Sequence, residues 1–380
     1  MQFKLDENQQ AVQDLVRDFA QGRLLPRVEE IEKADKFPDD IFKDMVENGI
    51  ISMNFPEQYG GMELGYVNLS IAIEEISKVS GSAGAFVCVT VLPLEAFELF
   101  GTEEQKQKYL VPGLQGKFKG SFAFTEAGTG SDPKQLTTTA KKTGDKYVIN
   151  GVKRFISNAA YEGPIVLFAK EAETDGCTAF IVNKFCEGYS ISTPWEKVGF
   201  HGSHVYDVFL DNVEVSEEDV LGKHGQGFDI LLAATTYGKL AFASVFAGTM
   251  GGAYELAVKY AKEKMHRDKP ISKFPTVRSK IAQIAANVES ARLLLYKAAE
   301  DADMIKGDMQ KLQCSTALVK GYIADLAIAT NVMSLNILGS YGVAEEYQVE
   351  RFLRDSLIGP NIEGSAEIQR LIAGGYILNN

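Results

Sequence analysis

A carboxylate stands at the centre of the first stretch that could do chemistry. Glu363 is followed by Gly364 and Ser365, and a loop-forming Gly359-Pro360 precedes it. Glycine lets a backbone come close to a ligand, and a serine here can cap the helix that follows. Glu363 would then lie on the loop, with its side chain free to act as a base. The competing interpretation is a surface carboxylate before an ordinary capped helix.

A second stretch, residues 122–132, reads Phe-Ala-Phe-Thr-Glu-Ala-Gly-Thr-Gly-Ser-Asp. Its hydroxyls and backbone N–H groups can bond to the polar edge of a ligand, and its glycines allow close approach. A glycine-rich connecting loop is the alternative that these residues leave open. Neither stretch alone is sufficient to assign a function, so we next consider the helices and strands that would bring the two stretches together.

Composition limits the classes of protein to which the chain can belong. Its 380 residues predict two or three domains, and its net charge of −12 argues against nucleic acid or an anionic membrane as the main partner. The four cysteines lie far apart, which favours reduced thiols in the cytoplasm. We expect no signal segment, no membrane span and no metal, because His201 and His204 have no third ligand near them.

The pattern of apolar residues divides the chain into three parts, which predicts an α+β multidomain fold. Residues 1–119 read as helices, with a capping box at Asp6 and Gln9 and a helix that ends before Pro112. Residues 120–227 contain short strands typical of a small β-barrel or sandwich. We expect turns at Gly151 and at 211–212. Residues 228–380 carry apolar stripes at helical spacing, which predicts an antiparallel four-helix bundle.

Three motifs taken together resemble those of the flavin-dependent acyl-CoA dehydrogenases. Residues 122–132 are similar to the family's Thr-Glu-Pro-x-Ala-Gly-Ser-Asp signature, residues 150–158 (Asn-Gly-Val-Lys-Arg-Phe-Ile-Ser-Asn) to its second flavin segment, and residues 363–365 to its Glu-Gly-Thr or Glu-Gly-Ser loop. The resemblance covers the chain from end to end. It implies the order helical domain, β domain and helical bundle.

The resemblance also implies FAD as the cofactor and assigns roles to individual residues. The base would be Glu363, and the substrate would contact Ser131, Lys239 and Gly364. The flavin would lie beside Phe155, which stands where the family often has Trp. The full set implied for the cofactor is Phe122, Thr125, Gly130, Ser131, Phe155, Ser157, Lys264, Arg267, Asn336, Gly339, Ser340 and Ser365.

The chemistry that the family performs is α,β-dehydrogenation of a saturated acyl thioester. The α C–H is weakly acidic, so it needs a positioned base and stabilisation of the enolate charge. The β-hydrogen leaves as hydride to the flavin. Some relatives place the base in the first bundle helix, but the matching residue here is Gly238. That favours Glu363, and we expect burial to raise its pKa.

Several family positions are altered, and the changes concern the far half of FAD and the CoA arm. The pattern Asp-x-Gly-Arg reads Thr236-Tyr237-Gly238-Lys239, and Arg267, Asp268, Pro275 and Asn336 replace Phe, Gly, Gln and Gln. Lys239 keeps a charge but loses the forked geometry of arginine. Either Lys264, Arg267 and Lys269 form a substitute pyrophosphate site, or the cofactor binds more weakly.

Three interpretations of function remain open at the level of sequence. The first is an acyl-CoA dehydrogenase that passes electrons to an electron-transferring flavoprotein, is active in fatty acid metabolism and assembles as a homotetramer. The second keeps the fold but works as an enoyl-CoA reductase or on a carrier-protein-bound acyl group. The third is a divergent, flavin-poor subunit that joins an active paralogue.

Overall fold

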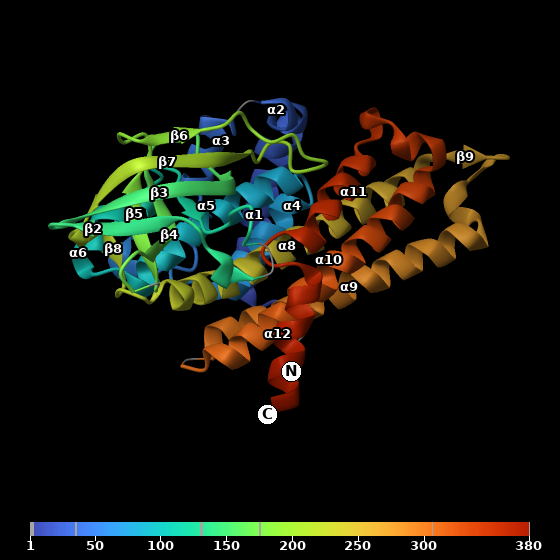
Figure 1. Cartoon of the computed structure of the whole chain (residues 1–380). Helices are drawn as coiled ribbons and strands as arrows, with labels where there is room; N and C mark the ends of the chain where they lie inside the picture. Colours follow the sequence, from blue (N-terminus) through green and yellow to red (C-terminus); the bar gives the residue numbers. More distant parts are fainter. Residues whose placement is uncertain (1–3, 35, 130–131, 175, 306, 380) are drawn as a thin grey trace.

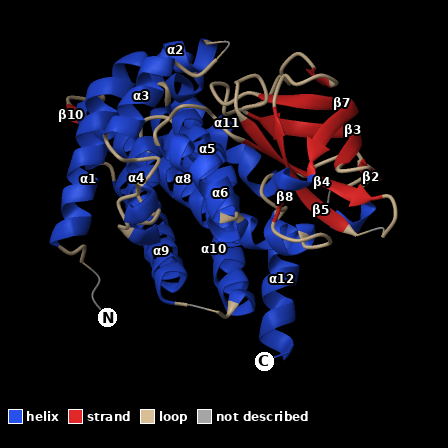
Figure 2. Ribbon diagram, turned by 90° about the vertical axis from the view of Figure 1, so that its left-hand side faces the viewer, coloured by secondary structure: helices blue, strands red, loops and turns tan. Residues whose placement is uncertain are grey.

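The computed structural model describes residues 4–34, 36–129, 132–174, 176–305 and 307–379 of the chain. A helical body carries a single large sheet on one side, and the last helix projects from the body (Figures 1 and 2). The helical N-terminal region, the middle sheet and the helical C-terminal region confirm the predicted fold class.

The N-terminal region consists of short outer helices and two central ones. Its α-helices are α1 Glu7–Phe19, α2 Val28–Lys33, α3 Asp39–Glu47, α4 Gly65–Ser77, α5 Gly81–Phe100, α6 Glu103–Gln105 and α7 Val111–Leu114. Asp6 and Gln9 form the predicted capping box. The helix expected to end before Pro112 continues instead: a π-helical turn leads into α7, where Pro112 lies in the first turn and its missing N–H costs nothing.

The middle region is an eight-stranded sheet ordered β6-β7-β3-β2-β4-β5-β8, with β1 paired to β4 in parallel. Its strands are β1 Ser121–Ala123, β2 Thr139–Thr143, β3 Lys146–Ser157, β4 Pro164–Glu171, β5 Cys177–Asn183, β6 Tyr189–Ile191, β7 Val205–Ser216 and β8 Val220–Leu221.

The turns expected at Gly151 and at 211–212 are absent, because β3 and β7 run through these positions as one long antiparallel pair. The pairing register shifts between Ile149 and Gly151, and Asn212 has φ 54°. Asn150 bonds to Asn212 through its amide, accepting from the backbone N at 2.8 Å. Glycine and asparagine therefore form an irregularity inside the ladder, and β3 carries the second motif onward to Ser157.

The C-terminal region is longer and more varied than a four-helix bundle. The first bundle helix, α8, begins at the predicted boundary, and a fifth helix, α11, lies between the long helices and the last one. Its helices are α8 Gly227–Glu263, α9 Pro275–Met304, α10 Met309–Leu338, α11 Val349–Ile358 and α12 Ala366–Asn379. A small hairpin, β9 Met265–His266 and β10 Lys269–Pro270, joins α8 to α9.

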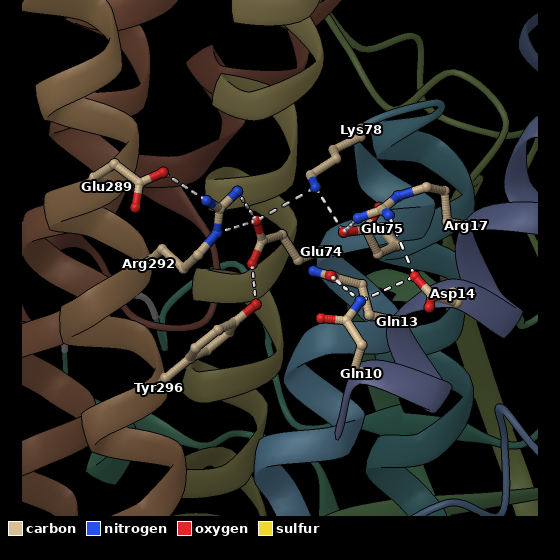
Figure 3. Close-up of polar contacts among 10 residues, drawn as sticks. All are labelled: Gln10, Gln13, Asp14, Arg17, Glu74, Glu75, Lys78, Glu289, Arg292 and Tyr296. Carbon is tan, nitrogen blue, oxygen red and sulfur yellow. Dashed lines mark hydrogen bonds and ion pairs between the residues drawn. The ribbon is translucent and has the colours of Figure 1, made fainter. Parts of the chain in front are cut away.

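Helix α4 docks on the bundle through buried charges that point toward one another (Figure 3). Glu74 accepts hydrogen bonds from Arg292 of α9 at 2.7 and 2.9 Å and from the Tyr296 hydroxyl at 2.7 Å. Glu75 pairs with Lys78 at 2.6 Å and with Arg17 of α1 at 3.2 Å. Burial alone would raise the pKa of Glu74, but Arg292 and Lys78 hold it below its usual value. The network fixes α4 against α1 on one side and against α9 on the other.

Three helices are long and apolar enough to cross a membrane by length and composition alone: residues 81–100, 227–263 and 309–343. In the structure, 78% and 83% of the apolar windows of the first two are buried inside the protein, and 44% of the third. The first two therefore form the centre of the helical body.

Candidate active site

Glu363 lies on the loop between α11 and α12, in a backbone conformation that other groups hold in place. Its φ is 50° and that of Gly364 is 77°, both in the left-handed region. Gln369 of α12 donates to the Glu363 carbonyl at 3.0 Å. Lys320 of α10 donates to the carbonyls of Ile362 and Gly364, the latter at 2.6 Å. Three consecutive carbonyls are thus clamped around the proposed base.

The glycine and the serine of this motif each have a local reason. A Cβ on Gly364 would lie 2.3 Å from the Gln369 amide nitrogen, so a side chain there would displace the clamp. Ser365 accepts a hydrogen bond from the Ile368 N–H at 3.3 Å, which confirms the predicted cap of α12.

The Glu363 carboxyl points into the protein toward α8. Its Oε1 is buried and finds no hydrogen-bond partner among the described residues. A Cβ on Gly238 would lie 2.2 Å from this oxygen and 3.3 Å from Leu92 Cδ1. Gly238 therefore leaves room for the carboxyl, where a larger residue would displace it.

Two lysines share the surroundings of this carboxyl. Burial raises the pKa of Glu363 to about 7, although Lys239 and Lys320 pull it down. Burial lowers the pKa of each lysine to about 8, against the opposing pull of Glu363. A carboxyl with this pKa can both accept and release a proton near neutral pH, as general bases require. Lys239 was predicted to contact the substrate, whereas the sequence analysis did not identify Lys320.

The Thr125 loop is fastened to β3 by a buried ion pair. Lys153 Nζ lies 2.7 Å from Glu126 Oε1, and both side chains are almost completely buried. The other Glu126 oxygen accepts from the Thr137 N–H at 2.6 Å. Burial would raise the pKa of Glu126, but Lys153 and these hydrogen bonds lower it to about 2. Arg154 N–H also donates to the Thr125 carbonyl at 2.8 Å.

The first two predicted flavin motifs are therefore one unit in space. The two motifs contain Glu126 and Lys153 but do not predict that these residues pair, because the alternation of β3 alone does not mark Lys153 as buried. The predicted residues Gly130 and Ser131 lie outside the described residues.

Phe155 departs from the usual behaviour of an aromatic residue, because 53% of its surface is exposed and its φ is 58°. Its ring lies 5.2 Å from that of Trp195. The Trp195 indole N–H donates to Asp207 at 2.9 Å, which holds this ring beside Phe155. Ser157 follows on the same strand and is half-buried, while Phe122 packs on Phe168 with ring centres 5.0 Å apart.

The remaining cofactor residues gather elsewhere. Lys264 lies beside the β9–β10 hairpin, with its Nζ 4.7 Å from the Tyr341 ring centre. Arg267 (φ 46°) and Asp268 (φ 65°) make the tip of the hairpin. Asn336, Gly339 and Ser340 are exposed at the end of α10. In Figure 1 the hairpin lies at the end of the bundle away from α12. One copy of the chain does not bring this group to Glu363.

The histidines have ordinary partners. The His201 ring contacts the Lys197 carbonyl at 2.9 Å and Arg354 at 3.3 Å. His224 lies between Glu171 at 2.7 Å and Glu217 at 2.6 Å. Within the described part of the chain, no group of three or more His, Cys, Asp or Glu could hold a metal ion.

Comparison with protein families matches all three regions of the chain. The acyl-CoA dehydrogenase N-terminal domain matches residues 6–117, the middle domain residues 121–213 and the C-terminal domain residues 225–377.

Individual relatives extend over the whole length. An acyl-CoA dehydrogenase of Bacillus subtilis is 36% identical over 98% of both chains, and a 3-(aryl)acrylate reductase of Clostridium sporogenes is 35% identical over 98% of this chain and 99% of its own. The structure of butyryl-CoA dehydrogenase from Megasphaera elsdenii matches with a TM-score of 0.94 and 32% identity over the whole of both chains. The chain belongs to the acyl-CoA dehydrogenase family, whose FAD-dependent oxidoreductases act on acyl-CoA thioesters.

Proposed function

We propose that Glu363 is the base that removes the α-proton of an acyl-CoA while its β-hydrogen leaves as hydride. The observation that carries this role is the buried Glu363 Oε1, which has no hydrogen-bond partner among the described residues although its loop is clamped on three carbonyls. An unpartnered acceptor in a fixed position costs free energy unless a substrate group fills it. Its pKa of about 7 suits proton abstraction at neutral pH.

The surrounding residues support each part of that step. The Glu363 backbone N–H would donate to the thioester carbonyl, as the family resemblance implies, and so stabilise the developing enolate charge. The positive charges of Lys239 and Lys320 favour the ionised form of the Glu363 carboxyl, which is the form that accepts a proton. Leu92 adds an apolar side chain at the point where Gly238 faces the carboxyl. Gly364 and Ser131 complete the substrate side of our assignment.

The residues present fit a flavin. Strand β3 carries the exposed ring of Phe155 and the half-buried Ser157, and the loop at Thr125 is hydrogen-bonded to this strand. Together they offer a ring face and hydrogen-bond donors to a flavin. We assign to the same flavin Phe122, Gly130 and Ser131, and Ser365 through the cap that shapes the base loop. When bound, FAD accepts the hydride.

We assign the far half of FAD to the hairpin end of a second copy. Lys264 and Arg267 would pair with the pyrophosphate, and Asn336, Gly339 and Ser340 would border it. Their distance from α12 within one chain supports the crossing of a subunit boundary. The exposed apolar side chains of α10 and α12 support a homotetramer, because a soluble monomer rarely leaves such residues uncovered; the set includes Leu318, Tyr322, Leu371, Ile377 and Leu378.

The wider setting follows from the family resemblance. We propose an electron-transferring flavoprotein as the electron acceptor and a role in fatty acid metabolism. A cytoplasmic location is supported by the four unpaired cysteines. The reverse reaction on an enoyl-CoA uses the same residues, and the similarity to a 3-(aryl)acrylate reductase favours keeping this direction as the second candidate.

The test is the colour of the purified protein and its response to substrates. We expect a yellow protein with one FAD per chain, bleached without oxygen by saturated acyl-CoAs. Bleaching by acyl-carrier proteins alone would move the substrate to a carrier. Protein that holds no FAD would contradict the proposal and favour a flavin-poor subunit.

A further inference from the structure

Glu95 is a buried carboxyl that the proposed reaction does not use. It lies in α5, three residues after Leu92 and seven after Cys88, so the three side chains share one stripe of the helix. Leu92 flanks the point where Gly238 meets Glu363, and the charge of Glu363 raises the pKa of the buried Cys88 thiol, after burial itself. Glu95 therefore extends the wall of the base centre by about 4.5 Å along the helix axis.

The carboxyl is held by two neutral donors. Its Oε1 accepts from the Asn54 amide at 2.6 Å, and its Oε2 accepts from the Tyr66 hydroxyl at 2.9 Å. Only 3% of Glu95 is exposed. Each carboxylate oxygen can accept a second hydrogen bond. The amide oxygen of Asn54 is also buried, and it finds no partner among the described residues. The cluster thus offers acceptors for a further donor.

Two aromatic rings form the open side of the cluster. Tyr66 stacks on Tyr237, with ring centres 4.5 Å apart and planes 12° from parallel. Tyr237 directly precedes Gly238 in α8, so the rings adjoin the base centre. Both tyrosines are half-buried, so part of each ring remains exposed. The faces of tyrosine rings attract cations.

The charged side chains that act on Glu95 and Tyr237 among the described residues are negative. Burial raises the pKa of Glu95 to about 7, and burial followed by the charges of Glu95, Glu98 and Asp303 raises that of Tyr237 to about 12. Asp303 also accepts from the backbone N–H of Tyr66 at 2.7 Å. Carboxylates, an amide oxygen and ring faces together favour a cation. Near Glu363, by contrast, the charged neighbours are Lys239 and Lys320.

We propose that Glu95, Asn54 and the Tyr66–Tyr237 pair form a subsite for an ammonium group carried by the acyl thioester, and so select amine-bearing substrates. The inference rests on the proposed function, because the subsite adjoins the Glu363 centre. The ammonium group donates to the Glu95 carboxylate and to the Asn54 amide oxygen while it lies against the rings. Binding also favours the ionised form of Glu95, so a proton is released near neutral pH.

Binding to three matched thioesters tests the subsite: ε-aminohexanoyl-CoA, ε-hydroxyhexanoyl-CoA and hexanoyl-CoA. Calorimetric titration of the FAD-containing Glu363→Gln variant measures affinity without turnover. We expect the amino compound to bind at least about tenfold tighter than hexanoyl-CoA, as one charge-assisted hydrogen bond would give. Adding Glu95→Gln to this variant should abolish the preference for the amino compound and leave the affinity for hexanoyl-CoA unchanged. Adding Tyr66→Phe instead should reduce the preference for the amino compound. Glu104→Gln, at an exposed position of α6, is the matched control.

A second readout is the proton itself. Titrations at pH 7 in buffers of different ionisation heat should show proton release with the amino compound, and none after Glu95→Gln. Equal affinity for the amino and alkyl compounds would overturn the subsite while leaving the proposed function standing. Equal loss for all three compounds in Glu95→Gln would also overturn it, because Glu95 would then support the common CoA arm. Failure of every acyl-CoA to bind would contradict the proposed function as well.

Discussion

The base loop and the hairpin end of the bundle are both assigned to the site, yet they are built in opposite ways. At the base loop, Lys320 and Gln369 fix the backbone on both sides of Glu363, and the carboxyl of Glu363 is buried. At the hairpin, Arg267 is an exposed residue at the tip of a turn, and the Nζ of Lys264 lies over the exposed ring of Tyr341. A group that moves a proton must be fixed before the substrate arrives, because misplacement costs rate. A site that only binds a cofactor can be completed later, when a second copy of the chain contributes its residues.

The strongest test of the comparison removes the base. Glu363→Gln keeps the size of the side chain but removes the carboxylate that accepts the proton. We expect flavin reduction by acyl-CoA to slow by roughly 10²–10⁴, the usual contribution of a general base, with FAD content unchanged. Stopped-flow absorbance measures the rate. Reduction at a rate close to that of the unaltered protein would place the base elsewhere.

The next test loosens the clamp and leaves the base in place. Lys320→Met removes the donor to two carbonyls of the loop and keeps a similar length. Each lost hydrogen bond to a charged group is worth about 1.5–3 kcal/mol. We expect a loss of flavin reduction of about tenfold or more, together with a lower melting temperature. The control is Lys311→Met, because Lys311 is exposed on the same helix. An unchanged reduction rate with lowered stability would limit Lys320 to a structural role.

The sequence predicts features that depend on neighbours along the chain, but it does not predict contacts between distant segments. The triplet 363–365 contains its own cap and its own glycine, so its conformation follows from neighbours along the chain. Lys320 and Gln369 act across a helix–helix contact, and only the fold brings them to the loop. Lys153 looks like a surface lysine in an alternating strand, but Glu126 gives it a buried partner. The unbroken β3–β7 pair was missed because glycine and asparagine signal a turn and a bulge alike.

The acidity of the base gives a prediction on pH. Because burial raises the pKa of Glu363 to about 7, the fraction that is ready to accept a proton grows as pH rises through that value. We expect the flavin reduction rate at saturating substrate to fall about tenfold for each pH unit below the pKa and to level off above it. In the Glu363→Gln variant, this decrease of the rate at low pH should be absent. A decrease that survives in the variant would belong to another group.

The smallest effect is expected at the hairpin. Arg267→Ala removes a charge that we assign to the FAD pyrophosphate of a second copy. Since the side chain is exposed at a turn, the loss should be modest, about 1 kcal/mol or some fivefold in FAD affinity. The reduction rate of FAD-saturated protein should stay unchanged, unlike that of Lys320→Met. The matched control is Lys273→Ala, which removes a charge just after the hairpin. FAD affinity can be followed by fluorescence quenching on titration into apoprotein. If Arg267→Ala instead slowed reduction at full FAD occupancy, the hairpin would take part in positioning the reacting groups, and the contrast between the two regions would fail.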